Sequence, residues 1–181
     1  MQIRKTNRMS SFDYSNKGGY FLTICCHNKM DFFGEVINNI MELNDFGRIA
    51  AECWNQIPKH FENCNLDEFI VMPNHIHGII FFEGESAMNK GAMNRHASSL
   101  HETSETDIRQ NQKVPVIIAS FKSAVSKFIH LEGNKGFKWQ KSYYDRIIRD
   151  NDELINIRQY IIDNPKNWEK DNKGQNENIM L

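Results

Sequence analysis

The chain has 181 residues, of which 40% are apolar and 25% are charged, with 22 Lys and Arg against 23 Asp and Glu. This length suits one compact domain, and the net charge of −1 excludes a protein that binds nucleic acid or membranes through its overall charge. No apolar run reaches the roughly 18 residues of a membrane span, and the polar start lacks an export signal, so we expect a cytoplasmic protein without a membrane partner.

Two elements are predicted in the first third of the chain. Residues 20–27 (YFLTICCH) are aromatic and β-branched and follow a pair of glycines, which is typical of a buried strand. Asn44 can cap a helix, because the apolar residues after it recur at spacings of three and four until Pro58. We therefore expect a strand followed by an amphipathic helix.

A β-hairpin is predicted in the middle of the chain. Residues 69–72 and 76–82 are apolar runs, and Pro73 and Asn74 between them suit the centre of a tight turn. The next segment, 83–113, is polar, contains no Phe, Trp or Tyr and shows no sustained periodicity. We expect this segment to be a mobile loop inserted in the domain.

Two more helices are predicted in the last third. Residues 116–131 carry an apolar stripe at helical spacing. Asp150 followed by Glu153 forms a capping box for a helix that we expect to end near Pro165, before a polar tail at 170–181. Helices that alternate with strands around a hairpin favour a single α/β domain spanning the chain, with a mainly antiparallel sheet.

The motif HIH at residues 75–77 carries the strongest chemical signal. In a strand, His75 and His77 point to one face and Ile76 to the other, so the two imidazoles can chelate one divalent ion. The alternative is a pair of surface or hydrogen-bonded histidines. Apolar flanking residues make the strand central, and buried imidazoles need a partner, which favours the metal site.

A second candidate cluster lies on the predicted C-terminal helix. Tyr160 and Asn164 are four residues apart, so they are neighbours on one helical face. The spacing is approximate, because the residue before a proline avoids helical geometry. A structural role is the alternative for Tyr160.

The histidine pair and the Tyr160–Asn164 pair together make a stronger case for a catalytic site than either pair alone. A tyrosine hydroxyl has a reference pKa of about 10 and is a poor nucleophile at neutral pH, so it needs a substrate activated by a cation. Two imidazoles and a carboxamide supply ligands without cancelling the charge of the ion. Attack by Tyr160 on a phosphodiester would leave a covalent phosphotyrosine and a free hydroxyl, and strands could be rejoined without ATP.

Three motifs in this order resemble one known family. The run MPNHIHGII at 72–80 is similar to the HUH motif of the single-tyrosine transposases of small insertion sequences. The run WQKSYYDRIIRD at 139–150, followed by YIIDNP at 160–165, resembles the branch called REP-associated tyrosine transposases. Residues 4–24 are similar to the N-terminal region of that branch.

This resemblance implies a ferredoxin-like antiparallel sheet with packed helices. It implies a transposase or endonuclease that acts in DNA transposition and recombination on single-stranded DNA with hairpins. The resemblance assigns His75, His77 and Asn164 to a magnesium or manganese ion, and Tyr160 to the nucleophile that forms a 5′-phosphotyrosine intermediate. Transposases of the wider family often act as homodimers, whereas members of the REP-associated branch can act alone, so the resemblance leaves both oligomeric states open.

A basic segment of the chain suits a DNA-binding surface. Residues 113–149 contain eight Lys and Arg against two Asp and Glu, with aromatic residues between them, as in single-strand binding surfaces. Trp139 is equally explained as a core residue. Tyr143 and Tyr144 are rival nucleophiles from sequence alone, although the resemblance favours a structural or DNA-contacting role. The residues predicted to contact DNA are Arg4, Lys5, Arg8, Lys122, Lys138, Trp139, Lys141, Tyr144, Arg146 and Arg149.

Two alternative functions from other classes stay open. A domesticated protein that binds DNA hairpins would keep the fold without cutting. Hydrolysis by activated water would use the metal without a covalent intermediate, but the chain has no recognisable carboxylate cluster around the HIH motif.

Overall fold

The main sheet of the protein has four antiparallel strands in the order β4-β5-β1-β6. We analysed a computed structural model that describes residues 18–62, 64–82 and 113–176. The four strands are β1 (Gly18–Cys25), β4 (Cys64–Met72), β5 (His75–Phe82) and β6 (Tyr144–Ile148). Helix α1 (Asp45–Asn55) follows the first of them, and α4 (Lys113–Leu131) follows the third. This β-α-β-β-α-β arrangement confirms the predicted ferredoxin-like α/β fold.

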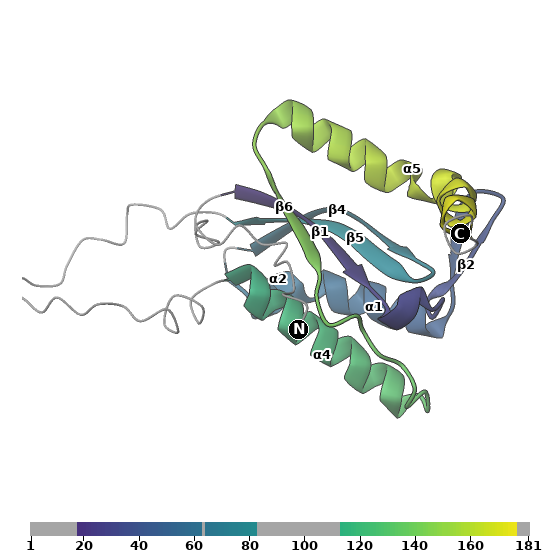
Figure 1. Cartoon of the computed structure of the whole chain (residues 1–181). Helices are drawn as coiled ribbons and strands as arrows, with labels where there is room; N and C mark the ends of the chain where they lie inside the picture. The colour runs from purple at the N-terminus through teal and green to yellow at the C-terminus, as the bar shows by residue number, and fades with distance from the viewer. Residues whose placement is uncertain (1–17, 63, 83–112, 177–181) are drawn as a thin grey trace, which may run out of the picture.

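The sheet separates two groups of helices. Figure 1 shows α1, α2 (Ile57–His60) and α4 on one side of the sheet and α5 (Asn151–Asn176) on the other. Side chains alternate along β1 and β5, so one set faces α1 and α4 and the other set faces α5. The side facing α1 and α4 holds most of the buried residues, including Tyr20, Leu22, Ile24, Ile76 and Ile80. A smaller apolar cluster under α5 contains Ile79, Ile148, Ile157 and Ile161.

The predicted β-hairpin is confirmed, and a second hairpin follows β1. Strand β2 (Gly34–Ile37) pairs with β3 (Ile40–Leu43) through a two-residue turn at Asn38 and Asn39. Both asparagines have positive φ, 52° and 63°, as the mirror-image turn of a tight hairpin requires. The sequence analysis missed this hairpin, although an Asn-Asn pair between alternating residues is a signal for it.

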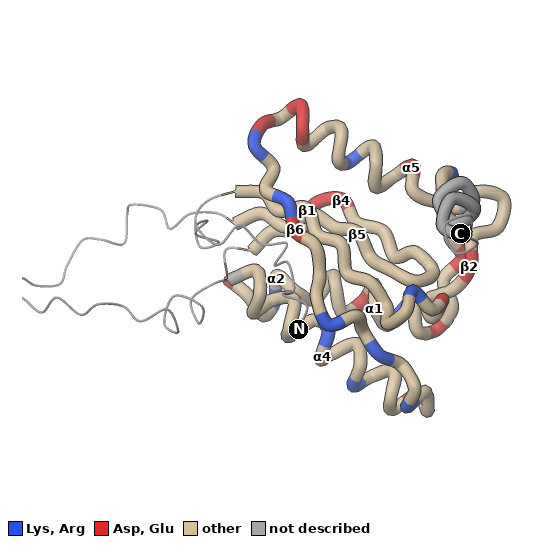
Figure 2. Tube along the Cα trace, viewed as in Figure 1, with Lys and Arg blue, Asp and Glu red and all other residues tan. Residues whose placement is uncertain are grey.

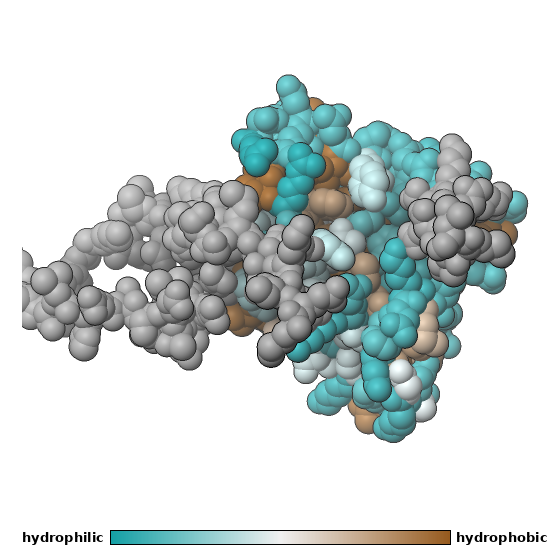
Figure 3. Space-filling view, in the orientation of Figure 1, coloured by the Kyte–Doolittle hydropathy of each residue, from teal (hydrophilic) through white to brown (hydrophobic). Residues whose placement is uncertain are grey.

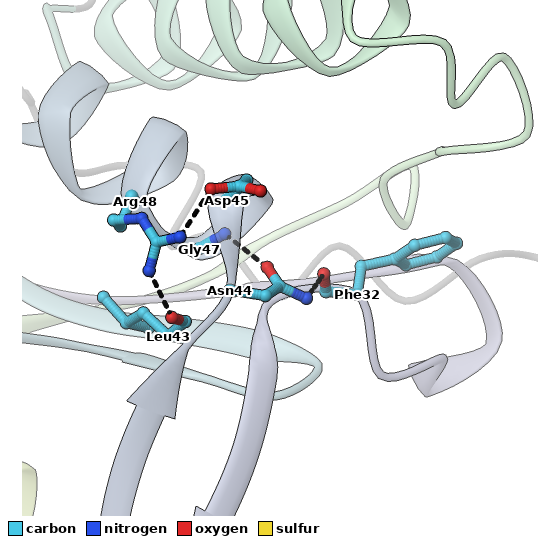
Figure 4. A network of polar contacts seen from close by, with 6 residues as sticks. All are labelled: Phe32, Leu43, Asn44, Asp45, Gly47 and Arg48. Atoms are coloured by element: carbon cyan, nitrogen blue, oxygen red, sulfur yellow. Dashed lines mark hydrogen bonds and ion pairs between the residues drawn. The ribbon is translucent and has the colours of Figure 1, made fainter.

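Asn44 caps α1 as predicted. Its Oδ1 accepts from the backbone N–H of Gly47 at 2.9 Å, while its Nδ2 donates to the Phe32 carbonyl at 2.9 Å (Figure 4). Arg48 donates to the Leu43 carbonyl at 2.7 Å. A capping interaction of this kind is worth about 1 kcal/mol. Asn44 thus ties the start of α1 to the segment between β1 and β2.

Helix α4 begins three residues earlier than the predicted helix, at Lys113. The last residue of the predicted loop is therefore helical, and residues 83–112 lie outside the described part of the chain. Among the described residues, α4 is the one helix long and apolar enough to cross a membrane. Its apolar stripe, which includes Val114, Ile117, Phe121 and Val125, is buried in the core, and this burial accounts for its composition.

The prediction that the last helix ends near Pro165 is wrong. The helix begins as predicted, with Asp150 Oδ1 accepting from the N–H of Glu153 at 2.7 Å, but α5 continues through a buried Pro165 to Asn176. A proline removes one hydrogen-bond donor and crowds the preceding turn, so a helix can bend there instead of ending. Figure 1 shows α5 changing direction in its yellow C-terminal part. Residues 170–176 of the predicted tail are thus helical, and 177–181 lie outside the described residues.

Gly78 is required by the close approach of a helix to the sheet. A Cβ added at Gly78 would lie 2.3 Å from Cζ2 of the fully buried Trp54 on α1. Overpacking of this kind costs about 1–3 kcal/mol. We expect Gly78→Ala to lower the free energy of unfolding by about that amount in urea denaturation. Gly18→Ala is the control, because an added Cβ there has nothing within 4 Å; equal stabilities of the two variants would contradict this packing.

Candidate active site

The two histidines of β5 lie side by side on the face of the sheet that α5 covers. Their ring centroids are 4.5 Å apart, with the planes at 72°. Thr23 is the β1 partner of His77, and Cys25 is the partner of His75. The period of two along the strand thus places both imidazoles on one face, as the sequence predicts, with Ile76 in the core below.

Helix α5 is held on the sheet by apolar and ionic contacts. Ile157 and Ile161 are buried against the sheet. Arg158 donates through Nε and an Nη to the two carboxylate oxygens of Asp67 on β4, at 2.6 and 2.5 Å. This pairing lowers the pKa of Asp67, mainly through the hydrogen bonds from Arg158. A bidentate pair has a defined geometry, so it fixes the rotation of the helix over β4.

This rotation brings Tyr160 and Asn164 to the histidines. The Tyr160 hydroxyl lies 3.4 Å from Nε2 of His77, and the two ring centroids are 5.2 Å apart. Asn164 is 4% exposed and hydrogen-bonded to His75. Tyr160 is 48% exposed, so its ring contacts the site while one side stays open to solvent. The structure therefore brings together all four residues that the sequence analysis assigned to the metal and the nucleophile.

Burial keeps both imidazoles neutral. Desolvation lowers the pKa of His75 to about 4, although the hydrogen bond to Asn164 acts in the opposite direction. Desolvation and the neighbouring His75 lower the pKa of His77 to about 3. A neutral imidazole has a free lone pair and can act as a metal ligand at neutral pH.

The Nδ1 atoms of both rings are engaged by side-chain oxygens. Thr23 Oγ1 lies 2.9 Å from Nδ1 of His77, and Asn74 Oδ1 lies 2.9 Å from Nδ1 of His75. Contacts of this kind orient metal-binding histidines through the ring nitrogen that does not bind the ion. The sequence analysis missed both partners. Asn74 was detectable as the residue before HIH, whereas Thr23 depends on the strand register.

The donor set fits a divalent ion. The described ranges contain no cluster of three or more His, Cys, Asp and Glu side chains. A metal here would instead take two neutral imidazoles and the carboxamide of Asn164. These ligands leave the charge of the ion intact and coordination positions free for phosphate oxygens, as electrophilic catalysis requires.

A cavity of about 420 Å³ opens beside the histidines. Its wall includes Lys29, Gln140, Tyr144 and Trp168, besides the residues already described. Trp168 follows Asn164 by one helical turn, and its ring centroid lies 5.9 Å from that of His75. The sequence analysis did not assign Trp168, because it expected the helix to end at the preceding proline.

Several of the predicted DNA-contacting residues lie near this cavity. Tyr144 is 45% exposed and pairs with Thr23, and Arg146 pairs with Phe21, so both side chains share the face of the histidines. Arg146 forms an ion pair with Glu153 and, with Arg149, lines a second hollow beside Tyr160. Figure 2 shows Lys and Arg along β6 and the segment leading into it, where Lys138 and Lys141 are exposed.

Other predicted residues have structural contacts. The indole of Trp139 packs on Phe33 and Phe137 and donates from Nε1 to the Lys122 carbonyl at 3.1 Å. These contacts account for Trp139 as a core residue, and DNA contact by it stays a prediction. Lys122 Nζ donates to the Gln140 carbonyl at 2.6 Å. Tyr143 is 6% exposed, which argues against it as a nucleophile. Arg4, Lys5 and Arg8 lie outside the described residues.

Comparisons with known proteins identify a relative in sequence and similar solved structures. An uncharacterized protein of Haemophilus influenzae is 38% identical over 168 residues, which cover 93% of this chain and 91% of the relative. The chain belongs to the same family as this protein. No model of a known protein family matches the chain.

One solved structure with a similar fold is that of a REP-associated tyrosine transposase bound to a REP hairpin. The TM-score is 0.52 at 13% identity, and the match covers 91% of this chain and 72% of the transposase. This similarity shows a common fold. It confirms the fold that the resemblance in the sequence implies.

The depressed pKa values of the two histidines predict a pH-dependent stability. In the unfolded chain both imidazoles take up protons below their ordinary pKa of about 6.5, whereas in the folded protein the pKa falls to about 4 for His75 and about 3 for His77. The free energy of unfolding should therefore fall between pH 6 and pH 4.5, by up to about 1.4 kcal/mol per pH unit for each imidazole.

Urea denaturation in EDTA at several pH values measures this dependence. The variant carrying His75→Gln and His77→Gln should have a shallower pH dependence than the wild type. Equal slopes for the two proteins would show that the imidazoles titrate normally in the folded state.

Proposed function

We propose that this protein is a metal-dependent DNA strand transferase in which Tyr160 cuts single-stranded DNA at hairpin-bearing sites. The observation that carries the proposal is the 3.4 Å distance between the Tyr160 hydroxyl and Nε2 of His77, next to His75 and Asn164. It brings a phenol to a pair of neutral imidazoles that suit a cation. The related fold of a transposase bound to a REP hairpin supports hairpin DNA as the substrate.

The reaction exchanges one ester bond for another. The Tyr160 oxygen attacks the phosphorus of a phosphodiester, and the bond from phosphorus to the 3′ oxygen breaks. The phenol gives up its proton, and the departing 3′ oxygen takes one up to become a hydroxyl. The 5′ phosphate stays joined to Tyr160, so a later attack by a 3′ hydroxyl releases the tyrosine and rejoins the strand without ATP.

The cofactor of this reaction would be Mg²⁺ or Mn²⁺, held by His75, His77 and Asn164. The bound ion would withdraw charge from the phosphodiester, which compensates for the weak nucleophilicity of a phenol. Tyr160 is 48% exposed and lines the cavity beside the histidines, so a phosphate would have access to it. Tyr160 approaches His77 of its own chain, which supports a site formed within one copy of the protein.

A strand of DNA can approach along β6. Arg146 and Arg149 beside Tyr160 would neutralise phosphates, and the exposed ring of Tyr144 would stack on a base. The exposed Lys138 and Lys141, in the segment that leads into β6, would add positive charge. Arg4, Lys5 and Arg8 would add a basic arm, and Lys122 and Trp139 would be further DNA contacts.

A covalent adduct with DNA tests the proposed nucleophile. The protein is incubated with Mn²⁺ and a hairpin oligonucleotide with a single-stranded flank labelled on its 3′ side, and the products are separated under denaturing conditions. Wild-type protein should retain the label. Tyr160→Phe and the addition of EDTA should each abolish the adduct, because one removes the attacking oxygen and the other removes the ion.

Tyr144→Phe is the matched control, because this second tyrosine lines the same cavity. It should keep both the adduct and the DNA binding, because phenylalanine retains the ring that would stack on a base. Persistence of the adduct in Tyr160→Phe together with its loss in Tyr144→Phe would reverse the assignment. Hairpin binding without any adduct would favour the domesticated DNA-binding protein, and oxygen from labelled water in a cleaved product would favour hydrolysis.

A further inference from the structure

We infer that Asp31 and Asn74 form a relay that fixes the tautomer of His75 and thereby presents its Nε2 atom to the site. Both are positioning residues that act through the imidazole. The inference deepens the proposed function, because it explains how one of the proposed metal ligands is prepared before any ion binds. It depends on three hydrogen bonds around a buried carboxamide.

The surroundings of Asn74 determine which way its amide points. Asn74 is 8% exposed, and its Nδ2 lies 2.9 Å from Oδ1 of Asp31 and 3.2 Å from the carbonyl oxygen of Lys29. Both of these neighbours are acceptors only. The NH₂ group must therefore face them, since the opposite orientation would put three oxygens together and leave the buried NH₂ without these acceptors.

The other end of the amide then determines where His75 carries its proton. Asn74 Oδ1 lies 2.9 Å from Nδ1 of His75 and can only accept a hydrogen bond. Nδ1 is therefore the donor, because a neutral imidazole has one N–H group and the oxygen of Asn74 is held toward Nδ1. Asn164, the other hydrogen-bond partner of His75, can turn its NH₂ group toward the remaining ring nitrogen. The lone pair of His75 is thus on Nε2. The Thr23 hydroxyl beside His77 can donate or accept, so that contact does not select a tautomer in the same way.

The backbone around the relay holds Asp31 in place. The N–H groups of Phe32 and Phe33 donate to the Pro73 carbonyl at 2.9 and 3.0 Å. The Cys26 N–H donates to the carbonyl of Asn74 at 2.8 Å. On the other side, Asn44 binds the Phe32 carbonyl (Figure 4). The segment that carries Asp31 is therefore attached both to the turn before His75 and to α1.

Four single variants test the relay in the full-length protein. Asn74→Ala removes the acceptor for His75. Asp31→Ala removes one of the two groups that orient the amide, whereas Asp31→Asn keeps an acceptor oxygen for the Asn74 NH₂ group. Glu35→Ala, which removes another exposed carboxylate, on β2, is the matched control. Circular dichroism shows whether each variant is folded.

The direct measurement is the protonation site of His75 in the metal-free protein, from ¹⁵N imidazole NMR at pH 7.5. Wild type, Asp31→Asn and Glu35→Ala should carry the proton on Nδ1. Asn74→Ala should give a mixture of tautomers, and Asp31→Ala a smaller change, because the Lys29 carbonyl still accepts. A wild-type proton on Nε2, or a folded Asn74→Ala protein with an unchanged tautomer, would overturn the inference.

Calorimetric titration with Mn²⁺ in the absence of DNA measures the consequence for the site. Loss of a partner that orients a metal ligand costs about 10–100-fold in affinity, which we expect for Asn74→Ala, with a smaller loss for Asp31→Ala and none for Asp31→Asn. Equal Mn²⁺ affinity in wild type and Asn74→Ala would contradict the role of the relay. If wild type binds no Mn²⁺ while His75 is protonated on Nδ1, the relay stands and the proposed metal-dependent function fails.

Discussion

The alternation of side chains along β5 is the constraint on which the site depends. One face of this strand must fill the core against α1 and α4, and it does so with Ile76, Gly78 and Ile80, where the missing side chain of Gly78 makes room for Trp54. His75 and His77 are therefore on the opposite face. There they are covered by α5, and the same burial that packs them keeps them neutral.

Helix α5 converts this pair of histidines into a candidate active site. Its apolar stripe and the Arg158–Asp67 pair fix its rotation, so that the next face of the helix points at the imidazoles. Because the helix continues through Pro165, Asn164 keeps helical spacing from Tyr160, and Trp168 reaches the same cavity. Figure 3 shows a largely hydrophilic surface with apolar residues between α5 and the sheet, which fits a helix docked on an otherwise polar face.

The sequence predicted the parts of the site that depend on local periodicity. The tight turn at Pro73, the shared face of the histidines and the helical neighbours Tyr160 and Asn164 all follow from regular spacings. The extent of α5 was not predictable from its proline, because tertiary packing decides whether such a helix bends or ends. β6 was missed because its alternating residues lie on an edge strand within a basic segment.

The relay to His75 could not be predicted for a different reason. Asp31 and Asn74 are 43 residues apart, and their contact arises only when the segment after β1 folds over the turn between β4 and β5. Trp139 was open to two interpretations for the same reason. An aromatic residue between lysines is typical of a surface that stacks on DNA bases, but the indole of Trp139 packs among Phe33, Phe121 and Phe137. Such contacts need a three-dimensional structure.

The central claim is that the two histidines, Asn164 and Tyr160 form one metal-dependent site. A crystal of the protein soaked with Mn²⁺ and measured near the manganese absorption edge tests it most directly. The account predicts an anomalous peak bonded to His75, His77 and Asn164, with the Tyr160 hydroxyl facing the same ion. A peak bound elsewhere, with these four side chains unliganded at saturating Mn²⁺, would contradict it.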